Sequence, residues 1–447
     1  MTADNVVKIG PQQASRRVPP APADLKATGV AQNFLEGLML KTMYALGLES
    51  TPELRSHLKL PDKVLNALFE EARRKGLMTV GDMSEFVARV ELRFHLTDRG
   101  RARAIEALDQ SQYVGAAPVS MADFIAQTKA QSVANEQITP AGLAACFGGM
   151  SMSEQLAEQI GAALNHGHSM LLYGPPGNGK SIYSEAIVRS FAQTVFIPHA
   201  VIVDGQVISL FDAAVHEPIG EAQAGQPGAE TAPDPRWVHC RRPAVIAGGE
   251  LTMEMLELVY DPNTKSYEAP LQLKATGGVF IIDDFGRQAV DPARILNRWI
   301  VPLERKHDYL ALRSGKKVAV PFDELLIFST NLDPNGFMDT AMMRRIHYKI
   351  EIGPPEREEY LAILAEECRK AGLALPADIV SYLCDEFYPQ GEVQIARFHP
   401  KWIVDHVTSG CAYDGVAPVL DRDRVARAMN NLFVPRAAQA SPAVRAP

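Results

Sequence analysis

One short segment limits what this chain can fold into more than any other: MLLYGPPGNGKS at residues 170–181. Gly174, Gly179, Lys180 and Ser181 fill the pattern G-x-x-x-x-G-K-[ST]. An apolar strand pattern precedes the loop, and the helix pattern SIYSEAIVRSF overlaps its end. Such a loop turns its backbone N–H groups inward on phosphate groups, and the helix N-terminus adds positive potential.

The loop therefore predicts a nucleoside triphosphate site with ATP and Mg²⁺ as cofactors. Its expected binding residues are Gly174, Pro175, Pro176, Gly177, Asn178, Gly179, Lys180 and Ser181. Lys180 is expected to reach the β and γ phosphates, while the hydroxyl of Ser181 supplies a magnesium ligand.

A second segment, GGVFIIDDFGR, ends a buried strand pattern in two carboxylates, Asp283 and Asp284. In a P-loop fold a carboxylate at this place holds magnesium, which we assign to Asp283. Asp284 is then expected to orient or deprotonate the attacking water. Most relatives carry Glu at this second place. The shorter Asp affects the expected hydrolysis rate more than nucleotide binding.

The strand patterns MLLY, VFIP, VFII and LLIF alternate with helical patterns between residues 150 and 352. This alternation predicts an α/β core with a parallel sheet and helices on both faces. Four helical patterns without strands follow over 353–434. With 447 residues the chain is long enough for two or three domains.

The remaining boundaries follow from composition. We expect disordered tails at 1–28 and 435–447, a linker at 111–149, and inserted hairpins at about 213–270. The segment GGELTMEMLELVYDPNTKSYEAP is expected to form a helix followed by a hairpin that turns at Pro262 to Thr264, and a second hairpin is expected in HDYLALRSGKKVAVPF. Tyr260, Tyr267 and Tyr309 lie in these hairpins, where they either touch a partner or pack across strands.

Residues 30–110 have the order helix, helix, helix, hairpin, helix, and the phrase FHLTDRGRARA resembles the wing end of a winged helix-turn-helix domain. Basic and acidic side chains are about equal in number there, whereas duplex binding needs a basic stripe. The pattern favours protein docking over nucleic-acid binding. The whole chain, with 45 basic and 53 acidic side chains, has a net charge of −8 and no general attraction to polyanions.

The strand LLIFST ends at Asn331 and is followed by DTAMMRRIHYKI. With this third element, residues 150–433 resemble an AAA+ ATPase, on the MoxR and enhancer-binding side of that superfamily. The resemblance implies that Asn331 is the sensor 1 residue and that Arg344 and Arg345 are arginine fingers. The whole chain is similar to a bacterial group of ATPases to which chaperone activity is ascribed.

The same resemblance makes the C-terminal helices the AAA+ lid, which carries a sensor 2 residue at the start of its third helix. In RFHPKWIVDHV the match is Lys401, with Arg397 as the competitor. Lysine keeps the charge of the family's arginine but lacks its planar fork.

Taken with the resemblance, the sequence predicts a magnesium-dependent ATPase that acts as a homo-oligomeric ring, a hexamer, and remodels a protein client. The alternative is a DNA-bound regulator or loader that uses the winged helix. The N-terminus lacks a signal-peptide pattern, and no apolar run reaches the length of a membrane helix. A cytoplasmic protein without membrane insertion is expected.

Overall fold

The computed structural model describes residues 18–81, 92–147, 152–220, 232–390 and 394–432. The expected tail at 435–447 and residues 1–17 of the expected tail at 1–28 lie outside these ranges. Residues 18–28 are folded, which corrects that boundary. The Asp234 amide donates to Pro19 O (2.8 Å), and the Ala21 amide donates to Ala232 O (2.9 Å). A Pro-rich stretch cannot form a helix, but its carbonyls can still pair with a neighbouring segment.

The N-terminal elements follow the expected order of three helices, a hairpin and a helix. They are α2 (Gln32–Leu46), α3 (Thr51–Leu58), α4 (Asp62–Arg74), β1 (Met78–Val80), β2 (Phe94–Leu96) and α5 (Asp98–Gln110), preceded by the short 3₁₀ helix η1 (Lys26–Thr28). Ser50 and Glu53 form a capping box at α3, and Thr97 caps α5. Residues 82–91, which belong to the expected hairpin, lie outside the described ranges.

The segment expected as a linker is part of the folded core. It forms β3 (Val119–Ser120), α6 (Met121–Ala130), the 3₁₀ helix η2 (Val133–Asn135) and α7 (Pro140–Phe147). Phe124 on α6 is 1% exposed and packs with strands that come much later in the chain. The turn residues that suggested a linker separate these short elements, so composition alone concealed them.

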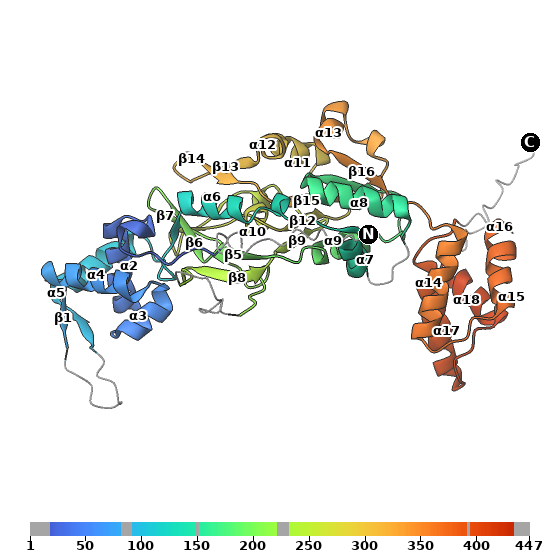
Figure 1. Cartoon of the computed structure of the whole chain (residues 1–447), viewed down its shortest axis with the longest axis horizontal. Helices are drawn as coiled ribbons and strands as arrows, with labels where there is room; N and C mark the ends of the chain where they lie inside the picture. Colours follow the sequence, from blue (N-terminus) through green and yellow to red (C-terminus); the bar gives the residue numbers. More distant parts are fainter. Residues whose placement is uncertain (1–17, 82–91, 148–151, 221–231, 391–393, 433–447) are drawn as a thin grey trace, which may run out of the picture.

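A five-stranded parallel sheet forms the centre of the molecule (Figure 1). Its order is β16 (Tyr348–Glu351), β4 (Met170–Tyr173), β15 (Leu325–Thr330), β12 (Val279–Ile282), β9 (Ala244–Ala247). All four strand pairings are parallel, as the sequence predicted. The strands that precede the P-loop, the paired aspartates and Asn331 are therefore three neighbours in this sheet.

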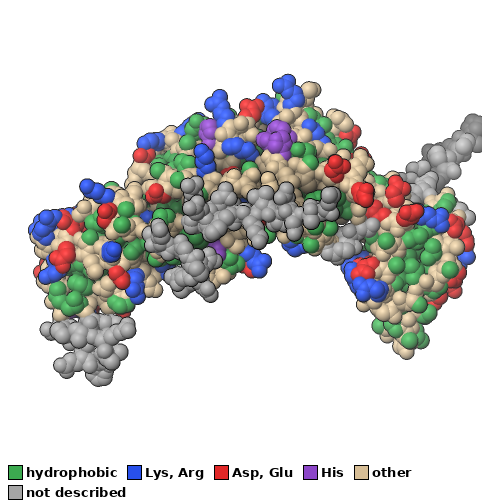
Figure 2. Space-filling model, viewed as in Figure 1, with side chains coloured by type: hydrophobic (Ala, Val, Ile, Leu, Met, Phe, Trp, Pro, Cys, Tyr) green, Lys and Arg blue, Asp and Glu red, His purple; other side chains and the backbone are tan. Residues whose placement is uncertain are grey.

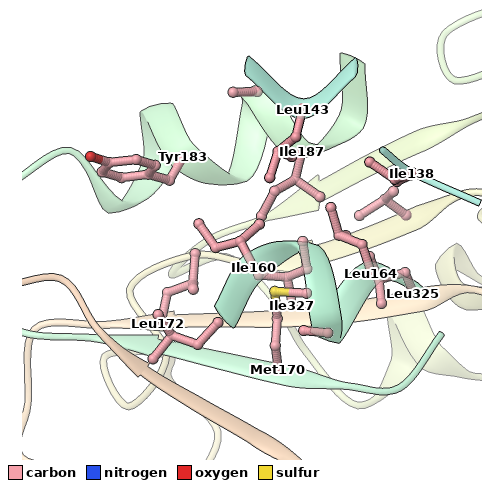
Figure 3. Close-up of a cluster of buried hydrophobic side chains, with 14 of the residues drawn as sticks. Ile138, Leu143, Ile160, Leu164, Met170, Leu172, Tyr183, Ile187, Leu325 and Ile327 are labelled. Carbon is pink, nitrogen blue, oxygen red and sulfur yellow. The ribbon is translucent and has the colours of Figure 1, made fainter. Parts of the chain in front are cut away.

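Helices cover both faces of the sheet. Figure 3 shows one of these cores, in which Ile160 and Leu164 of α8 (Glu154–His166) lie near Leu172 and Ile327 from the strands. Ile187 of α9 (Lys180–Arg189) belongs to the same core. The helices that complete this domain are α10 (Leu271–Lys274), α11 (Pro292–Arg298), α12 (Ile300–Arg305), the 3₁₀ helix η4 (Pro334–Gly336) and α13 (Thr340–Arg345).

One strand was assigned to the wrong sheet. The run VFIP forms β5 (Thr194–Pro198), which pairs antiparallel with β8 (Trp237–Arg241) and not with the parallel sheet. The edge position is taken by β9, the run AVIA. Both runs are short and apolar, so periodicity could not decide between them. About 45 inserted residues separate the two runs in the sequence.

The insertion is larger than the expected 213–270 and builds a second sheet. The order in that sheet is β10 (Val259–Asp261), β11 (Ser266–Glu268), β7 (Gln206–Ser209), β6 (Ala200–Val203) and β3. The expected helix before β10 is only the 3₁₀ turn η3 (Glu254–Leu256). The second expected hairpin is present as β13 (His307–Ala311) and β14 (Lys317–Pro321). Tyr260 and Tyr267 pack across β10 and β11, whereas Tyr309 is 46% exposed.

The C-terminal helices form a separate bundle at one end of the molecule (Figure 1). It comprises α14 (Arg357–Lys370), α15 (Ala377–Ser381), the π-helical segment η5 (Tyr382–Phe387), α16 (Tyr388–Gln390), α17 (His399–Asp414) and α18 (Arg422–Leu432). Tyr360 and Ile403 are among its fully buried side chains. We call this bundle the lid. No helix within the described ranges has the length and apolar character that crossing a bilayer requires.

Candidate phosphate-binding site

The loop after β4 has the shape that its glycines require. Gly174, Gly177 and Gly179 all have positive φ, of 139°, 79° and 87°. A Cβ on Gly174 would lie 2.4 Å from Ile352 O, so only glycine fits there. Lys180 Nζ donates to Gly174 O and Pro175 O, each at 2.9 Å. The loop thus curls around the Lys180 ammonium, whose pKa is lowered by burial.

Ser181 and Asp283 meet where α9 begins beside the end of β12. The Ser181 hydroxyl donates to Asp283 Oδ2 at 2.8 Å. A hydroxyl and a carboxylate are hard oxygen ligands, and Mg²⁺ in proteins uses one or two such groups together with water and phosphate oxygens. The pair therefore fits a magnesium site. Within the described ranges no group of three or more His, Cys, Asp and Glu side chains could hold a metal.

Asp284 and Asn331 lie side by side at the ends of neighbouring strands. Asn331 Nδ2 donates to Asp284 Oδ1 at 2.8 Å. Asp284 has φ of 48°, a left-handed conformation that is strained for a residue with a side chain. Its backbone continues into Phe285, whose amide donates to Ser329 O on β15. Asp284 lines the same cleft as Lys180 of the P-loop.

Gln288 braces this turn, and sequence reasoning missed it. Its Nε2 donates to Asp283 O (3.0 Å) and Asp284 O (3.3 Å), while its Oε1 accepts from the Gly286 amide. The side chain is 9% exposed. A lone glutamine four residues after a turn carries no recognisable pattern, so only the fold reveals this contact.

Arg344 and Arg345 end α13 and do not line the cleft that holds Lys180. Arg345 pairs with Glu304 (3.2 Å) and also donates to Ala341 O. Arg344 is exposed.

A cleft of about 750 Å³ opens between the P-loop and the lid. Lys180, Ser181, Asp283, Asp284 and Asn331 line its core side. Phe398, Trp402, Arg397 and Lys401 are among the lid residues on the other side. Phe398 rests on the P-loop: its amide donates to Gly177 O (3.1 Å), and a Cβ on Gly177 would lie 2.4 Å from its ring.

Of the two sensor 2 candidates, Arg397 lies against the P-loop. Its amide donates to Asn178 Oδ1 at 3.3 Å, and its guanidinium lies 5.7 Å from the centre of the Tyr183 ring. Lys401 is one turn further along and pairs with Asp405 on the same helix. Arg397 lies two residues before the lid's third helix, which begins at His399, and of the two candidates it is the one whose backbone contacts the P-loop.

A family model described as a domain of unknown function (DUF8689) matches residues 356–431, which correspond to the lid. No curated protein matches the chain. Solved structures of NtrX from Brucella abortus resemble it partly. One is 15% identical with a TM-score of 0.41, covering 65% of this chain and 57% of that one. Another, in complex with ADP, is 14% identical with a TM-score of 0.40 and covers 76% of this chain and 68% of that one.

The chain thus spans less than two thirds of the first NtrX structure. TM-scores this low carry no functional argument, so the function is argued below from the geometry of the chain's own residues. That geometry defines an α/β protein with a P-loop at the carboxyl edge of a parallel sheet, the usual place for ligands in such folds.

Proposed function

We propose that the protein is a magnesium-dependent ATPase of the AAA+ type. One observation carries the proposal: Ser181 with Asp283, and Asn331 with Asp284, form two hydrogen-bonded pairs beside Lys180 at one sheet edge. These are the groups that phosphoryl transfer to water needs, namely a cation for the phosphates, a magnesium site and a carboxylate for the water.

The roles follow from chemistry. Lys180 and the loop amides bind the phosphates of ATP, and Ser181 with Asp283 would hold Mg²⁺. Magnesium, when bound, neutralises charge on the transferring phosphoryl group. Asp284 orients the water and accepts its proton while the bond from the γ phosphorus to the bridging oxygen breaks. Asn331 fixes the Asp284 carboxylate for that task. The products are ADP and phosphate.

The proposal extends to assembly. Arg344 and Arg345 lie away from the cleft of their own chain, which is compatible with donation to the γ phosphate of a neighbouring copy. A ring, for which we propose a hexamer, would supply such a neighbour at every cleft. An arginine donor of this kind accelerates phosphoryl transfer by about 10³- to 10⁵-fold.

We further propose that the N-terminal elements dock a protein client that the ring remodels. Figure 2 shows Lys and Arg interspersed with Asp and Glu at that end of the molecule. At the end of α4, Arg73 pairs with Glu70 and Arg74 with Glu71, and the next residue, Lys75, pairs with Glu36 on α2. Cations engaged in this way are poor phosphate contacts, which disfavours the DNA-bound alternative.

The test is phosphate release with ATP and Mg²⁺, together with ATP binding by calorimetry. Wild type is expected to bind and hydrolyse ATP, and Lys180→Ala to lose both activities because it removes the ground-state phosphate contact. Equal ATP affinity in the two proteins would contradict the P-loop assignment. Affinity capture on an Asp284→Asn variant in ATP is then expected to retain the client.

A further inference from the structure

The Arg397 side chain links the lid to the segment that follows the core sheet through several hydrogen bonds. Its Nη2 donates to both carboxylate oxygens of Glu359 on α14, at 2.9 and 2.8 Å. Its Nη1 donates to Gly353 O, just after β16, at 2.7 Å. The Arg397 and Glu359 side chains are only 13% and 12% exposed. A two-oxygen contact of this kind fixes the guanidinium plane more strictly than a single bond.

The same side chain runs along the P-loop. Arg397 Cδ lies 4.0 Å from the place that a Cβ on Gly179 would occupy, directly before Lys180. The guanidinium stacks over Tyr183, which is on the first turn of α9. Arg397 thus lies next to the loop whose amides would hold phosphate.

One donor of Arg397 is left over. Its Nε is buried and has no hydrogen-bond partner within the part of the chain that the structure describes. An unsatisfied buried donor destabilises the folded state, and more so when it is charged. A phosphate oxygen reached by a small shift of the lid would satisfy it, and a guanidinium is the side chain best suited to phosphate.

The neighbouring pair on the lid offers an internal comparison. Lys401 Nζ contacts Asp405 Oδ2 at 2.7 Å, but both residues belong to α17 and their side chains are 66% and 58% exposed. This pair does not connect the lid to the core, and an exposed pair of this kind contributes little to stability.

We propose that Glu359 is a positioning residue for phosphate recognition, holding the Arg397 guanidinium beside the P-loop so that Arg397 donates to a phosphate oxygen of the bound nucleotide. The inference rests on the proposed nucleotide-binding function and adds Glu359 to the residues of that site. It also gives the matched domain of unknown function a role in this chain, since Glu359 and Arg397 both lie within residues 356–431.

The experiment measures the Kd of a non-hydrolysable ATP analogue with Mg²⁺ for full-length variants. Arg397→Ala and Glu359→Gln are each expected to weaken binding by about 10-fold or more, which corresponds to one charge-assisted hydrogen bond. The double variant is expected to bind no more weakly than Arg397→Ala alone, because Glu359 acts through Arg397. A matched control, Glu358→Gln on the same helix as Glu359, is expected to stay within about twofold of wild type.

A merely structural role for Glu359 would persist without Arg397, so Glu359→Gln would then still weaken binding in the Arg397→Ala background. That additive result would overturn the proposal, as would a larger loss for Lys401→Ala than for Arg397→Ala. If Arg397→Ala does not fold, Arg397→Lys keeps the charge without the fork and is expected to show the same non-additivity. A wild type that does not bind the analogue would contradict the proposed function itself. Normal binding by both wild type and Glu359→Gln would contradict this inference alone.

Discussion

At the scale of single residues, the proposed hydrolysis depends on the hydrogen bond between Asn331 and Asp284. Asp284→Asn is expected to retain ATP binding and to lower kcat by about 10²- to 10⁴-fold, because it removes the proton acceptor but no phosphate contact. Asn331→Ala is expected to lower kcat with little change in ATP affinity. Single-turnover kinetics and calorimetry on the same samples separate the two effects. A kcat close to wild type for Asp284→Asn would contradict the assigned role.

A second residue makes stability depend on pH. Glu324 is 4% exposed, and neither of its carboxylate oxygens has a hydrogen-bond partner among the residues that the structure describes. Burial, together with the nearby Asp323 and Asp308, raises its pKa well above the ordinary 4.5. The folded protein then keeps a proton that the unfolded chain releases, so stability is lost as pH rises above about 4.5.

Glu324→Gln removes this proton linkage. The variant is expected to be more stable than wild type at about pH 7.5, by about 1 kcal/mol or more, and the difference is expected to shrink as pH falls toward about 5. Thermal melts across this range provide the measurement. A stability gain that stays constant with pH would show that the carboxyl is not protonated in the folded state.

At the scale of elements, the β13–β14 hairpin is attached by a buried ion pair. Asp308 on β13 is 2% exposed and accepts from both Arg298 Nη atoms, at 2.6 and 2.9 Å. Asp308→Ala is expected to lower the free energy of unfolding by about 3 kcal/mol, because it leaves a charge buried without this partner. The exposed pair of Lys316 and Asp204 provides the control. Lys316→Ala is expected to change stability by less than about 1 kcal/mol in the same denaturant titration.

Local signals allowed much of the fold to be predicted. Helices α2 and α3 occur in the predicted order, because Gly47 ends the first and Ser50 begins the second with ordinary caps. The P-loop, both aspartates and Asn331 follow three of the strands in the parallel sheet. The two hairpins, β10–β11 and β13–β14, reverse direction at the Pro, Asn, Ser and Gly residues between their strands. These features depend on neighbours in the sequence, which is why sequence reasoning finds them.

Contacts between distant segments could not be predicted. Strand β3 is two residues long and pairs with β6, about 80 residues away, so no periodicity reveals it. The position of AVIA, in place of VFIP, at the edge of the parallel sheet also depends on contacts between distant segments. The same holds for the hydrogen bonds of Gln288 and Glu359. At these positions the choice of partner depends on tertiary packing, which overrides local preference.

At the scale of the whole molecule, the proposed ring predicts activity in a mixture of two inactive variants. One is Lys180→Ala, and the other carries Arg344→Ala with Arg345→Ala. A mixed ring contains interfaces where an intact P-loop meets an intact arginine pair, so part of the ATPase activity is expected to return. Mixed rings that form and remain inactive would count against action between subunits. A wild type that stays monomeric with ATP would count against the ring.

The charge distribution of the N-terminal end leads to another expectation. Full-length protein is expected to bind duplex DNA only weakly at physiological salt, because Arg73, Arg74 and Lys75 at the end of α4 are engaged by Glu70, Glu71 and Glu36. A fluorescence anisotropy titration measures this. A sequence-specific nanomolar complex would instead support the DNA-bound regulator.

The pairing of β3 with β6 also sets an order of events during synthesis. Val119 pairs with Val201, so β3 leaves the ribosome about 80 residues before its partner. At about 5–20 residues per second, this delay is about 4–16 s. Helices α2 to α5 can pack on one another in that interval, because their core is drawn mainly from residues 30–117. The inserted sheet, by contrast, forms only after β10 and β11 are made, so it closes late over a bundle that is already assembled.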